Sequence, residues 1–137
     1  MPDQIRKVQY YYATVPDKPG EGARILGALK EAGVNLMAFH AFPVGAQSQV
    51  DLVAEDAGAL KEAAKKAGIS LTGPKTAFLV EGEDRIGAVA EFMKRLGDAG
   101  VNVVAIDAVR AGGGRYGALF WVKPQDVEKA AGALGVK

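Results

Sequence analysis

The feature that most constrains this fold is an internal repeat with a period of 67 residues. When the chain is aligned with itself at this offset, without gaps, three features of the first copy match the second: a turn, the end of the helix that follows it, and a second helix further along. Such a register indicates a duplicated unit, because biased composition alone would not keep three separate features in step. The matched positions are Asp17 with Asp84, Gly20 with Gly87, Gly33-Val34-Asn35 with Gly100-Val101-Asn102, and Ala63-Ala64 with Ala130-Ala131.

Each copy predicts the same order of elements, strand-helix-strand-strand-helix-strand. Asp17 has the character of an N-cap, so the first helix is expected to begin there and to end at Gly33. In the second copy, the fourth strand is missing or reduced to residues 136–137, and that edge is either short or completed by another segment. The predicted strands are 8–15, 34–42, 49–54, 69–72, 76–80, 101–110 and 116–122; the other helices are 57–67, one following Asp84, and one from about Pro124.

This order predicts an α+β fold of two tandem ferredoxin-like βαββαβ units, the second truncated at its last strand. The antiparallel sheets would carry helices on one face, with domain boundaries at 1–72 and 73–137. Strands 34–42 and 116–122 are apolar on both faces, whereas a sheet exposed on one face alternates with polar residues. The second face is therefore expected to be buried by the other repeat or another chain, which predicts a homo-oligomer, a dimer or higher.

Charge and composition exclude several classes of partner. The formal net charge is +1 and the 17 basic residues are scattered, so no nucleic-acid partner is expected. No apolar run is long enough to span a bilayer, and residues 1–7 lack the apolar core of a signal peptide. The absence of cysteine is compatible with a reducing compartment. A cytoplasmic protein without a membrane partner is the expectation.

No constellation of residues predicts catalysis. His40 is the only histidine and has no neighbouring partners for a metal site or a nucleophilic triad, so an ordinary structural or interface role is expected. The glycines at 112–114 join two predicted strands and lack the lysine and hydroxyl residue of a phosphate loop. No catalytic residue, metal or cofactor is therefore predicted.

The duplicated turn is the best candidate for a binding device. A helix N-terminus presents unpaired amides and a partial positive charge, which suit a carboxylate or phosphate. Asp17 could pair with an ammonium group, or it could simply cap its own helix. Asn35 lies at the opposite end of that helix, where it could satisfy the turn. A ligand that contacts both residues would have to bridge neighbouring subunits or repeats.

The segment from Asp17-Lys18-Pro19-Gly20 to Gly33-Val34-Asn35-Leu36 resembles the signature of ACT domains, the small regulatory modules of amino-acid metabolism. The second copy is similar but has Ile86 where the proline would be. The resemblance extends over nearly the whole chain and implies a ferredoxin-like fold, paired domains and amino-acid ligands held at interfaces. The ligand-binding positions that it implies are Asp17, Lys18, Pro19, Gly20, Glu21, Asn35 and Leu36, and Asp84, Arg85, Ile86, Gly87, Asn102 and Val103.

Three functions remain open from the sequence. The first is a non-catalytic sensor that binds a small amino acid and regulates a metabolic enzyme. The second is a constitutive interaction module that docks on such an enzyme without a small ligand. The third, a small hydrolase on the same frame, is the least supported, because Lys18 and Arg85 are the nearest candidates and have no obvious catalytic partner.

Overall fold

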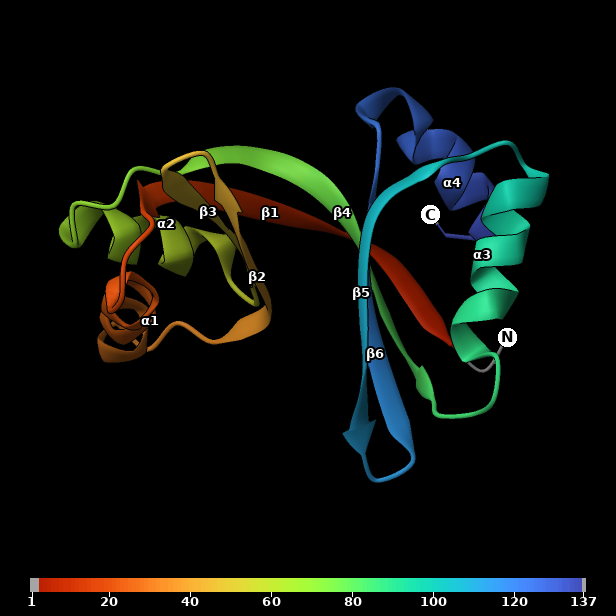
Figure 1. Cartoon of the computed structure of the whole chain (residues 1–137). Helices are drawn as coiled ribbons and strands as arrows, with labels where there is room; N and C mark the ends of the chain where they lie inside the picture. Colours follow the sequence, from red (N-terminus) through yellow and green to blue (C-terminus); the bar gives the residue numbers. More distant parts are fainter. Residues whose placement is uncertain (1–2, 137) are drawn as a thin grey trace. The chain divides into compact units, whose positions relative to one another are not determined.

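The computed structural model describes residues 3–136 and confirms the α+β class (Figure 1). Its strands are β1 (Gln4–Pro16), β2 (Leu36–Val44), β3 (Gln47–Ala54), β4 (Thr72–Glu83), β5 (Val103–Gly112) and β6 (Arg115–Val122). Its helices are α1 (Glu21–Glu31), α2 (Ala57–Lys66), α3 (Ala88–Asp98), α4 (Val127–Leu134) and the short 3-10 helix η1 (Pro124–Asp126). Helices α1 and α3, which are the first helices of the two repeats, match residue for residue under the shift.

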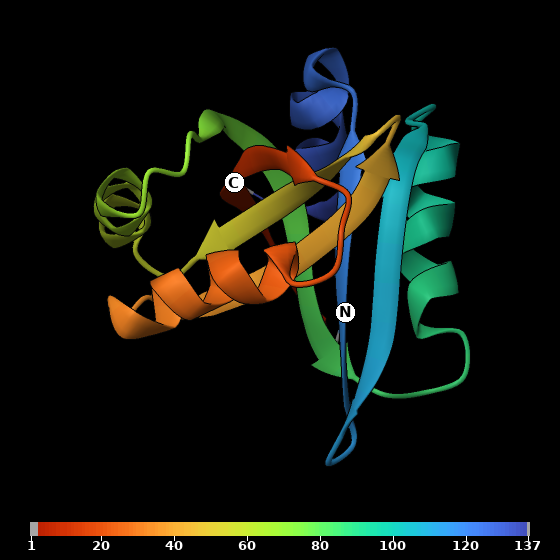
Figure 2. The same ribbon diagram turned by 60° about the vertical axis from the view of Figure 1, so that its left-hand side comes forward.

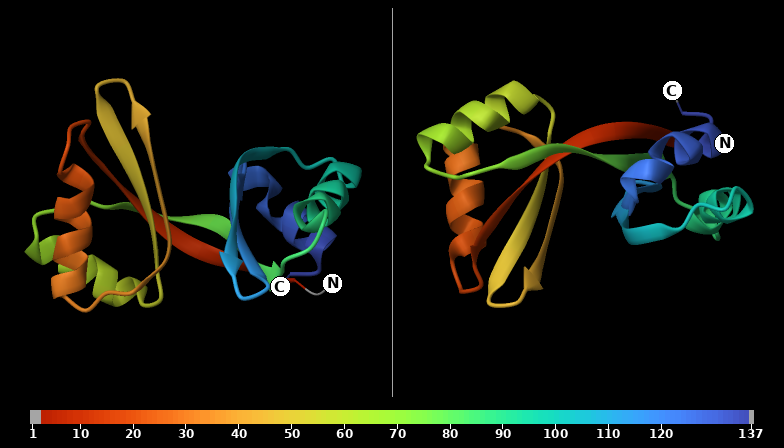
Figure 3. Two further views of the ribbon diagram at one scale, coloured as in Figure 1. Left: turned by 60° about the horizontal axis from the view of Figure 1, so that its bottom comes forward. Right: turned by 90° about the horizontal axis from the view of Figure 1, so that it is seen from above.

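The strands follow the order β2-β3-β1-β4-β6-β5, and the pairs β1–β3, β2–β3, β4–β6 and β5–β6 are antiparallel. Within the described residues the chain divides into two compact units. One unit is Gln9–Lys75, and the other combines residues 3–8 with residues 76–136. We call them the first unit and the second unit. Strands β1 and β4 are neighbours and each contributes residues to both units (Figure 3).

The sharing of β1 accounts for the strand that the second repeat lacks. Val136 lies outside any helix or strand, so the suggestion of a reduced strand at 136–137 is wrong for Val136, while Lys137 lies outside the described residues. The N-terminal part of β1 instead belongs to the second unit, next to β4, and Ile5 packs against its core. The edge is thus completed by another segment. The domain boundary at residues 72 and 73 stays a prediction.

The strands predicted at 69–72 and 76–80 are not separate. They are replaced by the single strand β4, which begins at Thr72 and continues to Glu83, while residues 69–71 lie outside any strand. Gly73 and Pro74 are residues that normally indicate a break, but here they lie at the beginning of a strand that continues through them. The last strand of one unit and the first strand of the other are therefore one element.

Each unit has its own apolar core beneath its helices. In the first unit, Ile25 and Leu29 of α1 pack with Leu60 of α2 against β1 and β3, and Figure 2 shows α1 alongside these strands. In the second unit, helices α3 and α4 cover β4 and β6. Phe120 stacks there on Phe78 and Phe92, with ring centroids 5.0 and 5.4 Å apart. Within residues 3–136, none of the helices has the length and apolar character required to span a membrane.

Candidate functional site

The first turn does not begin its helix at Asp17. Helix α1 starts at Glu21, and its N-cap is Gly20, with φ of 92° and no side-chain capping bond. The expected cap is wrong because the Asp17 carboxylate accepts a hydrogen bond from the Ser48 hydroxyl at 3.0 Å, on the β2–β3 hairpin. The Asp17 amide donates to the carbonyl of Ala46 at 3.3 Å. The turn is thus fixed to the neighbouring hairpin, and its glycine adopts the left-handed backbone that side chains disfavour.

The surface of this turn is open. A Cβ added at Gly20 or at Gly22 would meet no atom within 4 Å. Lys18 is exposed and has no ion pair within residues 3–136. The Glu21 carboxylate accepts a hydrogen bond from Arg24 at 2.8 Å, which lowers the pKa of Glu21. Around the N-terminus of α1, the side chains of Asp17 and Lys18 are therefore the charged groups available to a ligand.

Asn35 and Leu36 lie elsewhere in the first unit. They line a hollow of about 450 Å³ at the C-terminal end of α1, together with Leu26, Lys30 and Val34. None of residues 17–21 lines that hollow. The Asn35 carbonyl accepts a hydrogen bond from the amide of Glu55 at 3.1 Å, which holds the start of β2. The two halves of the predicted site are thus not brought together within one unit.

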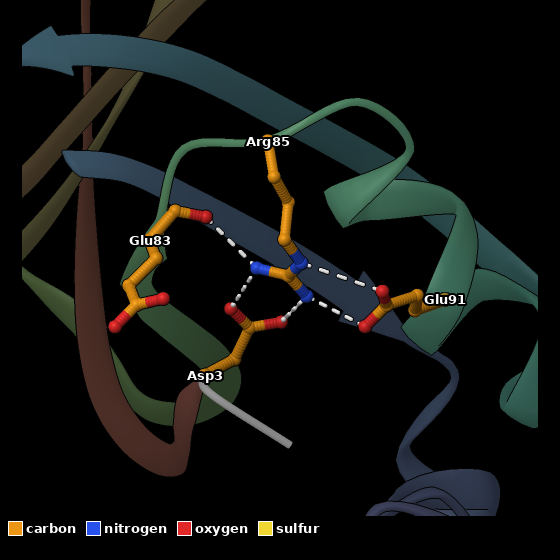
Figure 4. Close-up of polar contacts among 4 residues, drawn as sticks. All are labelled: Asp3, Glu83, Arg85 and Glu91. Carbon is orange, nitrogen blue, oxygen red and sulfur yellow. Dashed lines mark hydrogen bonds and ion pairs between the residues drawn. The ribbon is translucent and has the colours of Figure 1, made fainter. Parts of the chain in front are cut away.

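The second turn also begins its helix at a left-handed glycine, but its side-chain partners, shown in Figure 4, are different. Its Arg85 guanidinium donates to the Asp3 carboxylate at 3.0 and 3.2 Å, and to the Glu91 carboxylate at 2.6 and 3.3 Å. It also donates to the carbonyl of Glu83 at 2.8 Å. The side chain of Asp3 is fully buried. These bonds raise the pKa of Arg85 and lower that of Glu91. Unlike Lys18, Arg85 is neutralised within its own unit.

A small hollow of about 290 Å³ lies against this turn and is lined by Asp84, Arg85, Gly87 and residues 108–110. Arg110 approaches Asp84 across it, with 3.8 Å between Nε and Oδ2. Tyr116 also lines the hollow, and burial together with the neighbouring Asp3 carboxylate raises the pKa of Tyr116 to about 12. The charges around this hollow are therefore already largely paired.

The remaining predicted residues of the second repeat are placed apart from that hollow. Gly87 is the N-cap of α3, with φ of 77°. Asn102 is exposed and Val103 is half-buried at the start of β5. Neither residue lines the hollow at the second turn. Ile86, which stands where the first turn has Pro19, is fully exposed at the surface. The second repeat thus reproduces the separation between turn and second strand seen in the first.

Sequence reasoning also missed the buried charge of Asp51 on β3, whose relative exposure is 3%. It pairs across the sheet with Tyr12 on one side and His40 on the other. Burial raises the pKa of Asp51, although a hydrogen bond from Gln49 at 3.0 Å and the charges of His40 and Lys75 act in the opposite direction. No sequence signal marked Asp51, because alternation predicts only which face a strand residue occupies. Its position places His40 beside an acid.

Asp51→Asn is expected to stabilise the protein at neutral pH. A raised folded-state pKa means that the folded protein binds this proton more tightly than the unfolded chain. The contribution of Asp51 to stability is therefore fully present at pH values below its pKa in the unfolded chain. This contribution is lost as the pH rises through the pKa of Asp51 in the folded protein. The advantage of the amide should be absent at low pH and grow as Asp51 ionises, as measured by urea unfolding across pH. The exposed Asp98→Asn is the control, and an equal pH dependence in that variant would contradict the assignment.

Comparison with known proteins supports the fold. No family model matches the chain, and no curated protein matches it. Among solved structures, protein BT0572 from Bacteroides thetaiotaomicron aligns over 98% of this chain and 90% of its own, with 15% identity and a TM-score of 0.79. The ligand-free regulatory subunit of aspartate kinase from Thermus thermophilus aligns over 97% and 94%, with 19% identity and a TM-score of 0.63. The corresponding Thermus flavus subunit aligns over 98% and 95%, with 16% identity and a TM-score of 0.60.

These likenesses cover nearly the full length of each chain. The chain therefore has the tandem ACT-type fold found in regulatory subunits of aspartate kinase, and the resemblance noted from the sequence is confirmed at the level of fold. Within residues 3–136, no group of three or more His, Cys, Asp or Glu side chains is arranged to hold a metal ion.

Proposed function

We propose that this protein is a non-catalytic regulatory protein that binds a small amino acid at its first turn. The observation that carries the proposal is the difference between the two turns. The first leaves Lys18 unpaired within residues 3–136 and its glycines open, whereas Arg85 of the second is paired with Asp3 and Glu91. The fold shared with regulatory subunits of aspartate kinase supports a regulatory role.

The chemistry of the first turn suits a zwitterion. The N-terminal amides of α1 and the Lys18 ammonium would attract the ligand carboxylate. Asp17, whose carboxylate is oriented by Ser48, would accept hydrogen bonds from the ligand ammonium. A second copy of the chain would supply Asn35 and Leu36, because these residues line a different hollow within their own unit. The proposed site is therefore complete only in an oligomer.

Exposed apolar side chains also favour an oligomer. Phe39 on β2 and Val104 and Val109 on β5 are between 42% and 69% exposed in the single chain. The same side chains favour the second candidate function, a module that docks on a metabolic enzyme without a small ligand. In either case, regulation requires the bound state to prefer one assembly over another, since a ligand shifts an equilibrium only through differential affinity.

A thermal-shift screen against free amino acids tests the proposal. One amino acid at millimolar concentration is expected to stabilise the protein, by about 2.7 kcal/mol once it reaches a hundred times its dissociation constant. Asp17→Ala should abolish the shift, and Asp84→Ala, at the matching place in the second turn, should preserve it. The proposal fails if no amino acid stabilises the protein or if only Asp84→Ala removes the effect. A stoichiometric protein partner that is indifferent to Asp17→Ala would favour the docking module.

A further inference from the structure

Another hollow of the first unit lies between α2, the segment 67–71 that follows it, and β1. Figure 2 shows α2 and this segment leading into β4. We call this hollow, of about 510 Å³, the α2 groove. Its volume is in the range of small-molecule sites. Its lining residues are Tyr11, Lys61, Ala64, Lys65, Gly68, Ile69, Ser70, Leu71, Gly73 and Pro74.

The charged side chains that line the α2 groove are both positive, Lys61 and Lys65. Lys61 and Lys65 are four residues apart on α2, so their side chains lie on the same face of the helix and repel each other. Within residues 3–136 neither ammonium has an ion pair, and no acidic residue lines the groove. An anion bound between the two lysines would convert this repulsion into attraction.

The lysine pair is not part of the duplicated framework. Under the 67-residue shift, Lys61 matches Glu128 and Lys65 matches Gly132. Glu128 forms an ion pair with Lys7 at 3.1 Å in the second unit. Helix α4 thus forms and packs without either lysine, so the fold of a repeat does not depend on the pair. The two cations are a property of the first repeat alone.

The other wall of the α2 groove is mainly apolar. It contains the half-buried side chains of Ile69 and Leu71, the ring of Tyr11 and the exposed hydroxyl of Ser70. Gly73 holds this wall against β1. A Cβ added at Gly73 would lie 2.9 Å from the carbonyl oxygen of Tyr10 and 3.0 Å from the ring of Tyr11. Cations and a hydroxyl therefore lie beside an apolar wall whose backbone is closely packed on the sheet.

We propose that the α2 groove binds a small organic anion. The Lys61 and Lys65 ammonium groups and the Ser70 hydroxyl contact its carboxylate or phosphate group, and its apolar body packs against Ile69 and Leu71. Lysine offers a point charge rather than the planar fork of arginine, so the pair accepts either oxyanion. This site is separate from the first turn, because none of residues 17–21 lines the groove.

Amide NMR titrations with four probes test this proposal on the full-length protein. The probes are benzoate and phenyl phosphate, which carry both the charge and the apolar body, inorganic phosphate, which carries only the charge, and benzyl alcohol, which carries only the ring. We expect at least one of the first two to shift the amides of Ile69, Ser70 and Leu71 and to bind more tightly than the last two. The comparison of benzoate with phenyl phosphate identifies the preferred oxyanion.

Matched charge variants complete the test. K61Q/K65Q is expected to weaken binding by roughly five- to tenfold, from two partly exposed charge contacts. K66Q/K123Q removes the same net charge away from the α2 groove and should leave the affinity unchanged. Equal binding of inorganic phosphate would indicate an adventitious ion only and would overturn the proposal. The proposal would also be overturned if no probe shifted the amides of residues 69–71 or if benzyl alcohol bound as tightly as benzoate and phenyl phosphate. Equal weakening of binding in K61Q/K65Q and K66Q/K123Q would overturn it as well. Binding of free amino acids that depends on Asp17 reports separately on the first turn.

Discussion

A chain without residues 1–8 is expected to lose the folded structure of its second unit. The missing residues supply the strand beside β4, together with the half-buried Ile5 and the buried Val8. Loss of these two side chains alone should remove about 3 kcal/mol or more. Asp3 is also lost, which leaves Arg85 without its buried partner. A folded unit of about 60 residues is only marginally stable, so these losses are expected to unfold it.

Trp121 makes this prediction easy to measure. It is the only tryptophan, lies on β6 of the second unit and is 7% exposed. Its fluorescence should shift to longer wavelength in the shortened chain, while the first unit, residues 9–75, keeps its secondary structure. Appending residues 3–8 after residue 136 through a flexible linker should restore the native emission. Native emission with an unchanged unfolding midpoint in the shortened chain would show that the N-terminal strand is dispensable.

Phe120→Ala is expected to destabilise the second unit by about 3–5 kcal/mol. The Phe120 ring is fully buried and stacks nearly parallel to Phe78 and Phe92, with interplanar angles of 8° and 19°. Its removal therefore leaves a cavity that two rigid neighbouring rings cannot easily fill. Urea unfolding followed by Trp121 fluorescence measures the loss. Ile86→Ala is the control, because Ile86 is fully exposed and its truncation should change the free energy of unfolding by less than about 0.5 kcal/mol. Comparable losses in both variants would contradict the assigned core.

The parts of the fold that depend on local sequence could be predicted. The helix endings at Gly33 and Gly100 need a left-handed residue, and both glycines have positive φ, of 74° and 76°. Ile25 and Leu29 are four residues apart, which places both side chains on one face of α1, and both are buried. The tandem pattern itself followed from the repeat. Each of these features is decided by neighbours within a few residues.

The features that were missed depend on contacts between distant segments. Asp17 was predicted to cap α1 because it lies just before the helix in the sequence. Its carboxylate instead accepts a hydrogen bond from Ser48, 31 residues away. Arg85 looked available for a ligand, but its partner Asp3 is 82 residues away. The predicted first strand began at residue 8, whereas β1 begins at Gln4, because its N-terminal part is a strand only through pairing with a distant segment. Local patterns specify the elements, whereas the partners of their charged groups are decided by the assembled sheet.

The sharing of β1 and β4 also imposes an order of events during synthesis on the ribosome. The first unit, Gln9–Lys75, has every residue it needs once the chain has emerged past Lys75. Residues 3–8 are made before the rest of the second unit but pair in the sheet only after β4 has been made. The core that they cover is complete only when β6 and α4 have emerged as well. These residues are thus translated before the rest of the second unit but are among the last to be fixed, and we expect a chain whose emerged part ends near residue 80 to hold one folded unit and an unpaired N-terminal strand segment.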